Sequence, residues 1–176
     1  MSTGNAPQRV TLPVVVNVFD ARFEYDPEDP DGYRGGVARV GKEAGGADLT
    51  VKLYELPPGQ ALCPYHYEYV EEWMLLLDGA LTLRTPDGER AIQRGELVCF
   101  PGGPDGAHKV ATTGEATARF IMFSSAGLPA VVVYPDSDKV GVWTSSDTDD
   151  FMFRRRDANV AHYDGETTDQ RNPEGR

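Results

Sequence analysis

Short runs of strand-forming residues, each closed by a turn residue, constrain the fold of this chain more than any other feature. Between residues 48 and 134 the sequence falls into runs of four to nine residues that end at Gly, Pro or Asp. In the run from 48 to 56, Leu49, Val51 and Leu53 alternate with polar residues, which is the period of a strand with one buried face. Many short strands with frequent turns are typical of an all-β barrel or sandwich.

Further strands are predicted along the same region, and two of them form a hairpin. The tetrapeptide from Thr85 to Gly88 reads Thr-Pro-Asp-Gly, in which proline presets one backbone angle and glycine accepts a positive φ. No segment longer than about 10 residues has a helical period with caps, so we expect little helix. The additional predicted strands are 73–77, 81–84, 89–93, 97–100, 119–123 and 130–134.

The length of 176 residues indicates a single domain with one core. We predict a barrel domain over residues 1–143, in which 1–9 form a disordered leader and Val14–Phe19 the first strand. Residues 144–176 are polar and are predicted to be an appended C-terminal arm, partly disordered, whose apolar piece Phe151–Phe153 docks on the barrel or on a partner subunit.

The charge balance narrows the range of partners. The formal net charge is −11, which disfavours binding to phosphate backbones and anionic lipid, so we expect neither nucleic acid nor membrane as a partner. No apolar run approaches the roughly 18 residues of a membrane span, and no secretory signal is visible at the N-terminus. We therefore expect a cytoplasmic protein with a small-molecule ligand or substrate.

Two of the three histidines lie in the strand-rich region, one of them beside carboxylates. Side chains two apart on a strand share a face, so His66, Glu68 and Glu72 can all point the same way. Burying two carboxylates without a partner is costly, whereas a divalent cation neutralises both and accepts the neutral imidazole nitrogen. The pattern therefore predicts a metal site, with His108 as a further candidate. His162 is interpreted as an ordinary residue of the arm.

The spacing of these residues resembles that of the cupin superfamily, and in particular its single-domain bacterial members. The first motif reads Gly59-x6-His66-x-Glu68-x3-Glu72-x6-Gly79. The second reads Gly95-x5-Pro101-x-Gly103 and leads into His108. The resemblance covers roughly residues 48–123, and it implies a jelly-roll barrel in which His108 faces the ligands of the first motif. The four motif glycines are interpreted as turn residues.

The resemblance implies one divalent metal ion held by His66, Glu68, Glu72 and His108. The family commonly has a second histidine where this chain has Glu68, and a carboxylate there makes the site harder and favours iron, manganese, nickel or zinc over Cu(I). Glu68 has an alternative role as an acid or base that hydrogen-bonds a metal-bound water. Glu71 competes with Glu72, but motif spacing and strand period both select Glu72.

The function implied is that of a metalloenzyme for a small organic molecule. A dioxygenase-like oxidoreductase is the first hypothesis and an aldose-ketose type isomerase the second. The alternative is a non-catalytic barrel that binds or senses a small molecule. A sugar-phosphate substrate is disfavoured, because Lys52, Arg84 and Lys109 are isolated cations and phosphate recognition usually recruits several donors. The family resemblance also implies a homodimer, formed through Val14–Phe19 and the C-terminal arm.

Overall fold

The protein is an all-β structure with very little helix, as predicted. A computed structural model describes residues 13–125, 127–144, 146, 148–162 and 164. The helical turns are short: α1 (Val40–Glu43), α2 (Arg155–Ala158) and three 3-10 turns at Val18–Asp20, Pro104–Gly106 and Pro135–Ser137. Within the described residues, no helix is long and apolar enough to cross a membrane. The strands are β1 (Glu24–Tyr25), β2 (Gly36–Ala38), β3 (Leu49–Leu56), β4 (Tyr67–Glu68), β5 (Glu72–Asp78), β6 (Leu81–Thr85), β7 (Gly88–Ile92), β8 (Leu97–Phe100), β9 (Lys109–Ala111), β10 (Ala118–Ser125), β11 (Ala130–Tyr134), β12 (Lys139–Trp143) and β13 (Phe151–Arg154).

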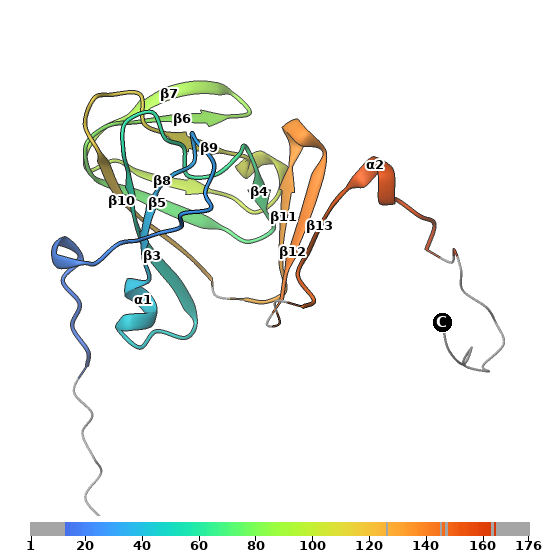
Figure 1. Ribbon diagram of the computed structural model, residues 1–176, viewed down its shortest axis with the longest axis horizontal. Helices are drawn as coiled ribbons and strands as arrows, with labels where there is room; N and C mark the ends of the chain where they lie inside the picture. The colour runs from blue at the N-terminus through green and yellow to red at the C-terminus, as the bar shows by residue number, and fades with distance from the viewer. Residues whose placement is uncertain (1–12, 126, 145, 147, 163, 165–176) are drawn as a thin grey trace, which may run out of the picture.

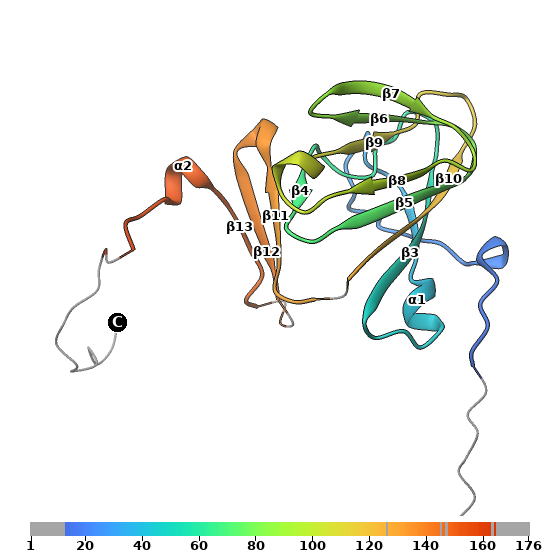
Figure 2. The same cartoon turned by 180° about the vertical axis from the view of Figure 1, so that it is seen from behind.

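Three antiparallel sheets build the jelly-roll barrel. The largest has the order β1-β2-β3-β10-β5-β8, the second β7-β6-β9 and the third β13-β12-β11-β4. Figures 1 and 2 show β6, β7 and β9 as a layer over β5 and β8, with the third sheet closing one end through β4. The predicted hairpin is confirmed, because β6 and β7 pair from Leu81 with Ile92 through to Thr85 with Gly88.

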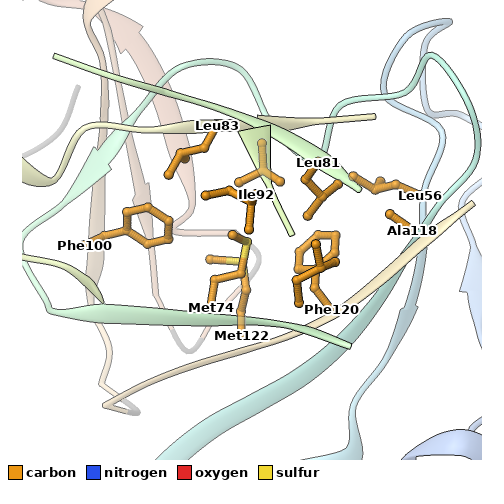
Figure 3. Packing of buried hydrophobic residues seen from close by; sticks show 11 residues of the cluster. Leu56, Met74, Leu81, Leu83, Ile92, Phe100, Ala118, Phe120 and Met122 are labelled. Atoms are coloured by element: carbon orange, nitrogen blue, oxygen red, sulfur yellow. The ribbon is translucent and has the colours of Figure 1, made fainter. Parts of the chain in front are cut away.

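The main core lies between the first two sheets. Met74 and Phe120 from the large sheet meet Leu83 and Ile92 from the small one, as Figure 3 shows. Phe120, Met74 and Ile92 have no exposed surface. Removing this much apolar surface from water is the main stabilising contribution to the barrel.

The alternation along β3 is real, but its two faces have different partners. Leu53 packs in an outer cluster with Ala38 and Val40, so this predicted apolar side is covered by β2 and α1. The opposite face carries Tyr54, which packs against the main core, and Lys52. The inner face of β3 is therefore the more polar one, which a buried functional site requires.

The strand predicted at Val14–Phe19 is not formed. The chain there makes no strand pairing and then turns into the 3-10 segment Val18–Asp20. The turn is stabilised by Asn17, whose side-chain oxygen accepts a hydrogen bond from the Phe19 amide at 3.1 Å. Val15 is 88% exposed and Phe19 70%. The short N-terminal strand is β1 instead, because strand propensity is realised only where a partner strand is available.

The predicted C-terminal arm begins as part of a sheet. Its apolar piece, Phe151–Phe153, lies in β13, which pairs with β12 and places Phe151 opposite Val142. After β13, Arg155 forms an ion pair with Asp138, with Nε 3.1 Å from Oδ1. The segments predicted to be disordered, 1–9 and the last dozen residues, lie outside the described residues.

Two motif glycines provide a test of the barrel's packing. Gly79 has φ of 79°, and a Cβ there would lie 2.8 Å from the Ala118 Cα, whereas Gly59 has φ of 75° with open space around it. Both Ala substitutions strain the backbone, but only Gly79→Ala also forces β10 to move. We expect Gly79→Ala to lower the free energy of unfolding by about 2 kcal/mol more than Gly59→Ala does, measured by urea denaturation. Equal losses would contradict the close contact with Ala118.

Candidate metal centre

His66 and His108 are brought together by a bridge between their backbones. The His66 amide donates to the His108 carbonyl at 3.1 Å, and the His108 amide donates to the His66 carbonyl at 2.8 Å. Residues that face each other in this way send their side chains to the same side of the sheet. The two imidazole centroids lie 4.6 Å apart. The backbone pairing therefore turns two distant histidines into one cluster.

Each imidazole is held by a carbonyl two residues earlier in the chain. His66 Nδ1 lies 2.9 Å from the Pro64 oxygen, and His108 Nδ1 lies 2.9 Å from the Gly106 oxygen. A carbonyl only accepts, so each Nδ1 carries the proton and each Nε2 keeps a free lone pair. Burial lowers the pKa of both rings, that of His108 to about 4 with a further contribution from His66. Both histidines are thus neutral and oriented as ligands.

Glu72 completes a group of three at the start of β5. Its Oε2 lies 3.8 Å from His108 Nε2, and the ligand atoms of His66, Glu72 and His108 all lie within 4.8 Å of one another. Burial raises the pKa of Glu72 to about 7, and the nearby Glu68 adds to the rise while Lys52 opposes it. His108 Nε2 is buried and has no hydrogen-bond partner among the described residues.

These features fit a divalent metal ion. A buried nitrogen without a partner and a half-buried carboxyl group are each costly, and one cation placed between them satisfies both. Two imidazole nitrogens and one carboxylate oxygen are a common ligand set for transition metals. The three residues therefore form a site that suits a metal ion.

Glu68 does not belong to this group of three. It lies on β4 opposite Val132, is half-buried and lines the same cavity as Glu72. Burial raises the pKa of its carboxyl group, and Lys52 opposes that rise. Its role as a fourth ligand stays a prediction. Its position beside the site also suits the alternative role of an acid or base. Glu71, the competitor of Glu72, is exposed and accepts a hydrogen bond from Trp73 Nε1 at 2.6 Å.

A cavity of about 800 Å³ adjoins the three-residue site. Its charged residues are Lys52, Glu68 and Glu72, and the rest of the lining combines apolar side chains, Phe123 and Trp143 among them, with a few hydroxyl groups. Cavities of this size, apolar with a few placed polar groups, are typical of small-molecule sites. The site is thus open to a ligand of moderate size.

Sequence comparison gives the family. The sequence profile described as "Cupin domain" matches residues 52–124, which contain His66, Glu68, Glu72 and His108. The chain carries a cupin domain. The structure brings three of those four residues together in the arrangement described above, which is compatible with a metal ion. No functionally curated protein matches the sequence.

Several solved structures share the fold at low sequence identity. A sugar phosphate isomerase of the cupin superfamily from Silicibacter pomeroyi is 20% identical with a TM-score of 0.72, over 85% of this chain and 98% of its own. A protein from Acidithiobacillus ferrooxidans, provisionally assigned the same activity, is 21% identical with a TM-score of 0.72, over 82% and 92%. The polyketide cyclase RemF from Streptomyces resistomycificus is 20% identical with a TM-score of 0.57, over 68% and 84%. Proteins with this fold are thus assigned different reactions. The likeness therefore establishes the fold, and the reaction has to be inferred from the residues of the site.

One residue that supports the cupin site is not evident from the sequence. The Phe100 ring stacks on the His108 imidazole, with centroids 3.8 Å apart and an angle of 12° between the planes. Phe100 also lies directly opposite Glu72 in the pairing of β5 with β8. In the sequence it is simply the last residue of an apolar run, because neither the register nor the stacking can be inferred from spacing.

Phe100→Leu is expected to weaken metal binding by about tenfold while the barrel remains folded. The smaller side chain leaves the His108 ring free to tilt, and loss of outer-shell support typically costs about 10-fold to 100-fold in affinity. Competition with a chelator measures the change. Ile92→Val is the control, since Ile92 is buried in the same core cluster. An unchanged affinity in the Phe100 variant would show that the stacking does not orient His108.

The aromatic residues flanking His66 pack into the barrel. Tyr65 and Tyr67 are buried in a cluster with Ala107 and Val133, so they are packing residues. Tyr134 lies beside the site, its ring centroid 6.0 Å from that of His66. These contacts hold the histidine-bearing segment in place.

Proposed function

We propose that this cupin is a metal-dependent oxygenase of a small organic molecule, in which His66, Glu72 and His108 bind one divalent ion. The observation that carries the proposal is the buried, unpartnered Nε2 of His108 beside the carboxylate of Glu72. Two histidines and one carboxylate with open coordination positions are the ligand set of non-haem Fe(II) oxygenases. Iron is therefore the first candidate, ahead of manganese, nickel and zinc.

The bound metal ion would supply an electrophilic centre and, as iron, a site for activating dioxygen. The protein's own residues prepare this chemistry. His66, Glu72 and His108 would hold the ion and would leave room at it for substrate and water, and the apolar side chains of the cavity would contact the body of the substrate. Glu68 faces the same cavity and can accept or donate a proton at its carboxylate, as a general acid or base.

An isomerase is the second candidate, favoured by the likeness to the Silicibacter pomeroyi structure. A sugar phosphate fits this cavity poorly, because Lys52 is the one cationic side chain among the described residues that line it. Binding of a phosphate dianion usually recruits several donors. We therefore rank the isomerase below the oxygenase.

Oxygen uptake tests the proposed reaction. The iron-loaded protein is incubated with a panel of small aromatic and aliphatic acids, ketones and phenols under ¹⁸O₂, and the products are analysed by mass spectrometry. The proposal expects oxygen uptake with label in the product, and none in metal-free protein. Tight binding of a panel member without turnover, in protein that retains its metal, would favour the non-catalytic binding barrel.

The protein is also expected to be a homodimer. Val14 and Val15 at one end of the described chain, and Phe151 and Met152 on the edge strand β13, are exposed apolar residues. Exposed apolar edge strands invite pairing with another chain. Light scattering should give about twice the monomer mass, and a monodisperse monomer would contradict this expectation.

A further inference from the structure

The cavity beside the metal site contains one cationic side chain, Lys52, which forms no close ion pair with a described residue. Lys52 projects from the inner face of β3, where its neighbours Thr50 and Tyr54 line the same cavity. Its side chain is half-buried, and among the described residues no carboxylate oxygen lies within ion-pair distance (4.0 Å) of Nζ. Withdrawing an ammonium group partly from water is unfavourable unless an anion meets it. The charge of Lys52 acts on Glu68 and Glu72 only at longer range, so the cavity offers a cation that no described carboxylate contacts directly.

The charges that line the cavity also favour an anionic ligand. Glu68 and Glu72 contribute two negative charges to the cavity, and Lys52 contributes one positive charge. Once a divalent ion is bound, the positive charges exceed the negative ones by one. A substrate with a single negative charge would make the site neutral. A phosphate dianion would leave the site with a net negative charge, and it would have one lysine as a donor where phosphate sites usually have several.

The other residues that line the cavity indicate the chemical character of the rest of such a substrate. Phe123, Leu128, Val131 and Trp143 are apolar residues that line the same cavity. Apolar and aromatic walls bind apolar bodies, while the few polar groups fix orientation. A ligand that fills this space has a charged end and an apolar end.

We infer that Lys52 binds the carboxylate of a monoanionic substrate with an apolar or aromatic body. This inference deepens the proposed function and rests on it for the charge of the metal ion. It makes Lys52 a residue that determines specificity, and it predicts that carboxylic acids are the members of a substrate panel that bind.

Calorimetric titration of the zinc-loaded protein tests the inference with three probes that share a phenyl body. 3-Phenylpropanoate has one negative charge, 3-phenylpropanamide is its neutral analogue, and 2-phenylethyl phosphate is the dianionic analogue. We expect the carboxylate to bind at least about tenfold more tightly than the amide, and no less tightly than the phosphate ester.

Three variants isolate the contribution of the lysine. Lys52→Met removes the charge and keeps the length of the side chain, and it should weaken binding of the carboxylate about tenfold while leaving the amide unchanged. Lys52→Arg should retain most of the preference. Lys42→Met, at an exposed position of α1, is the matched control and should bind like the wild type. Elemental analysis and unfolding curves verify that each variant keeps its metal and its fold.

The outcomes separate this inference from the proposed function. Metal-loaded protein in which Lys52→Met binds the carboxylate as the wild type does would overturn the inference and leave the metal site intact. Tighter binding of the phosphate ester, or no binding of the carboxylate at millimolar concentration, would overturn it as well. Protein that takes up no metal but still shows a lysine-dependent preference would overturn the metal function and retain Lys52 as the anion site.

Discussion

Replacing His108 by alanine is expected to lower the affinity for a divalent metal by at least about 100-fold. Removal of outer-shell partners costs about 10-fold to 100-fold, and loss of a ligand should equal or exceed the upper end of that range. His108 provides the nitrogen that is buried without a partner in the described structure, 3.8 Å from Glu72. Metal content after dialysis, followed by chelator competition, measures the change.

Controls distinguish loss of the ligand from loss of the fold. His108 is fully buried, so its truncation also leaves a cavity in the barrel. His108→Gln fills more of that space without an imidazole, and it should also lose the metal while unfolding at a urea concentration near that of the metal-free wild type. His162→Ala removes an exposed histidine and should keep the metal. Retention of metal by both His108 variants would show that this residue is not a ligand.

The second large effect is a contrast between two glutamates four residues apart. Glu72→Gln should lose the metal as His108→Ala does, because the amide removes the negative ligand of the group of three. Glu68→Gln should keep the metal and lower turnover by about 100-fold to 1000-fold, the range expected for a missing general acid or base. The assays are metal content for both variants and oxygen uptake for Glu68→Gln.

Glu71→Gln is the matched control for this contrast. Glu71 is the exposed neighbour of Glu72 and hydrogen-bonds Trp73, so its amide variant should keep both metal and turnover. If Glu68→Gln loses the metal to the same extent as Glu72→Gln, Glu68 is the fourth ligand that the sequence motif predicts. If it keeps both metal and turnover, Glu68 has neither role.

The sequence predicts the local features of this fold well. Strand period and turn residues locate most strands, and the hairpin of β6 and β7 follows from four residues around Pro86. All four motif glycines have positive φ, so the turns they mark are real. These features depend on a few neighbouring residues, which is the scale at which backbone preferences act.

What the sequence leaves undetermined is the pairing of distant segments. Val14–Phe19 has strand propensity, yet the local cap at Asn17 prevails because no strand pairs with it. The stacking of Phe100 on His108 and the cavity position of Lys52 arise from register between strands far apart in the chain. Spacing can select Glu72 over Glu71, but it cannot separate Glu68 from the group of three, since that depends on how β4 meets β11.

The metal content of the untagged wild-type protein tests the central claim most directly. The protein is purified without chelator, dialysed against a mixture of Fe²⁺, Mn²⁺, Ni²⁺ and Zn²⁺ under anaerobic conditions, freed of excess metal and subjected to elemental analysis. The arrangement of His66, Glu72 and His108 predicts about one equivalent of transition metal per chain. Less than about one tenth of an equivalent, in protein that is folded, would contradict the metal centre and with it the proposed oxygenase.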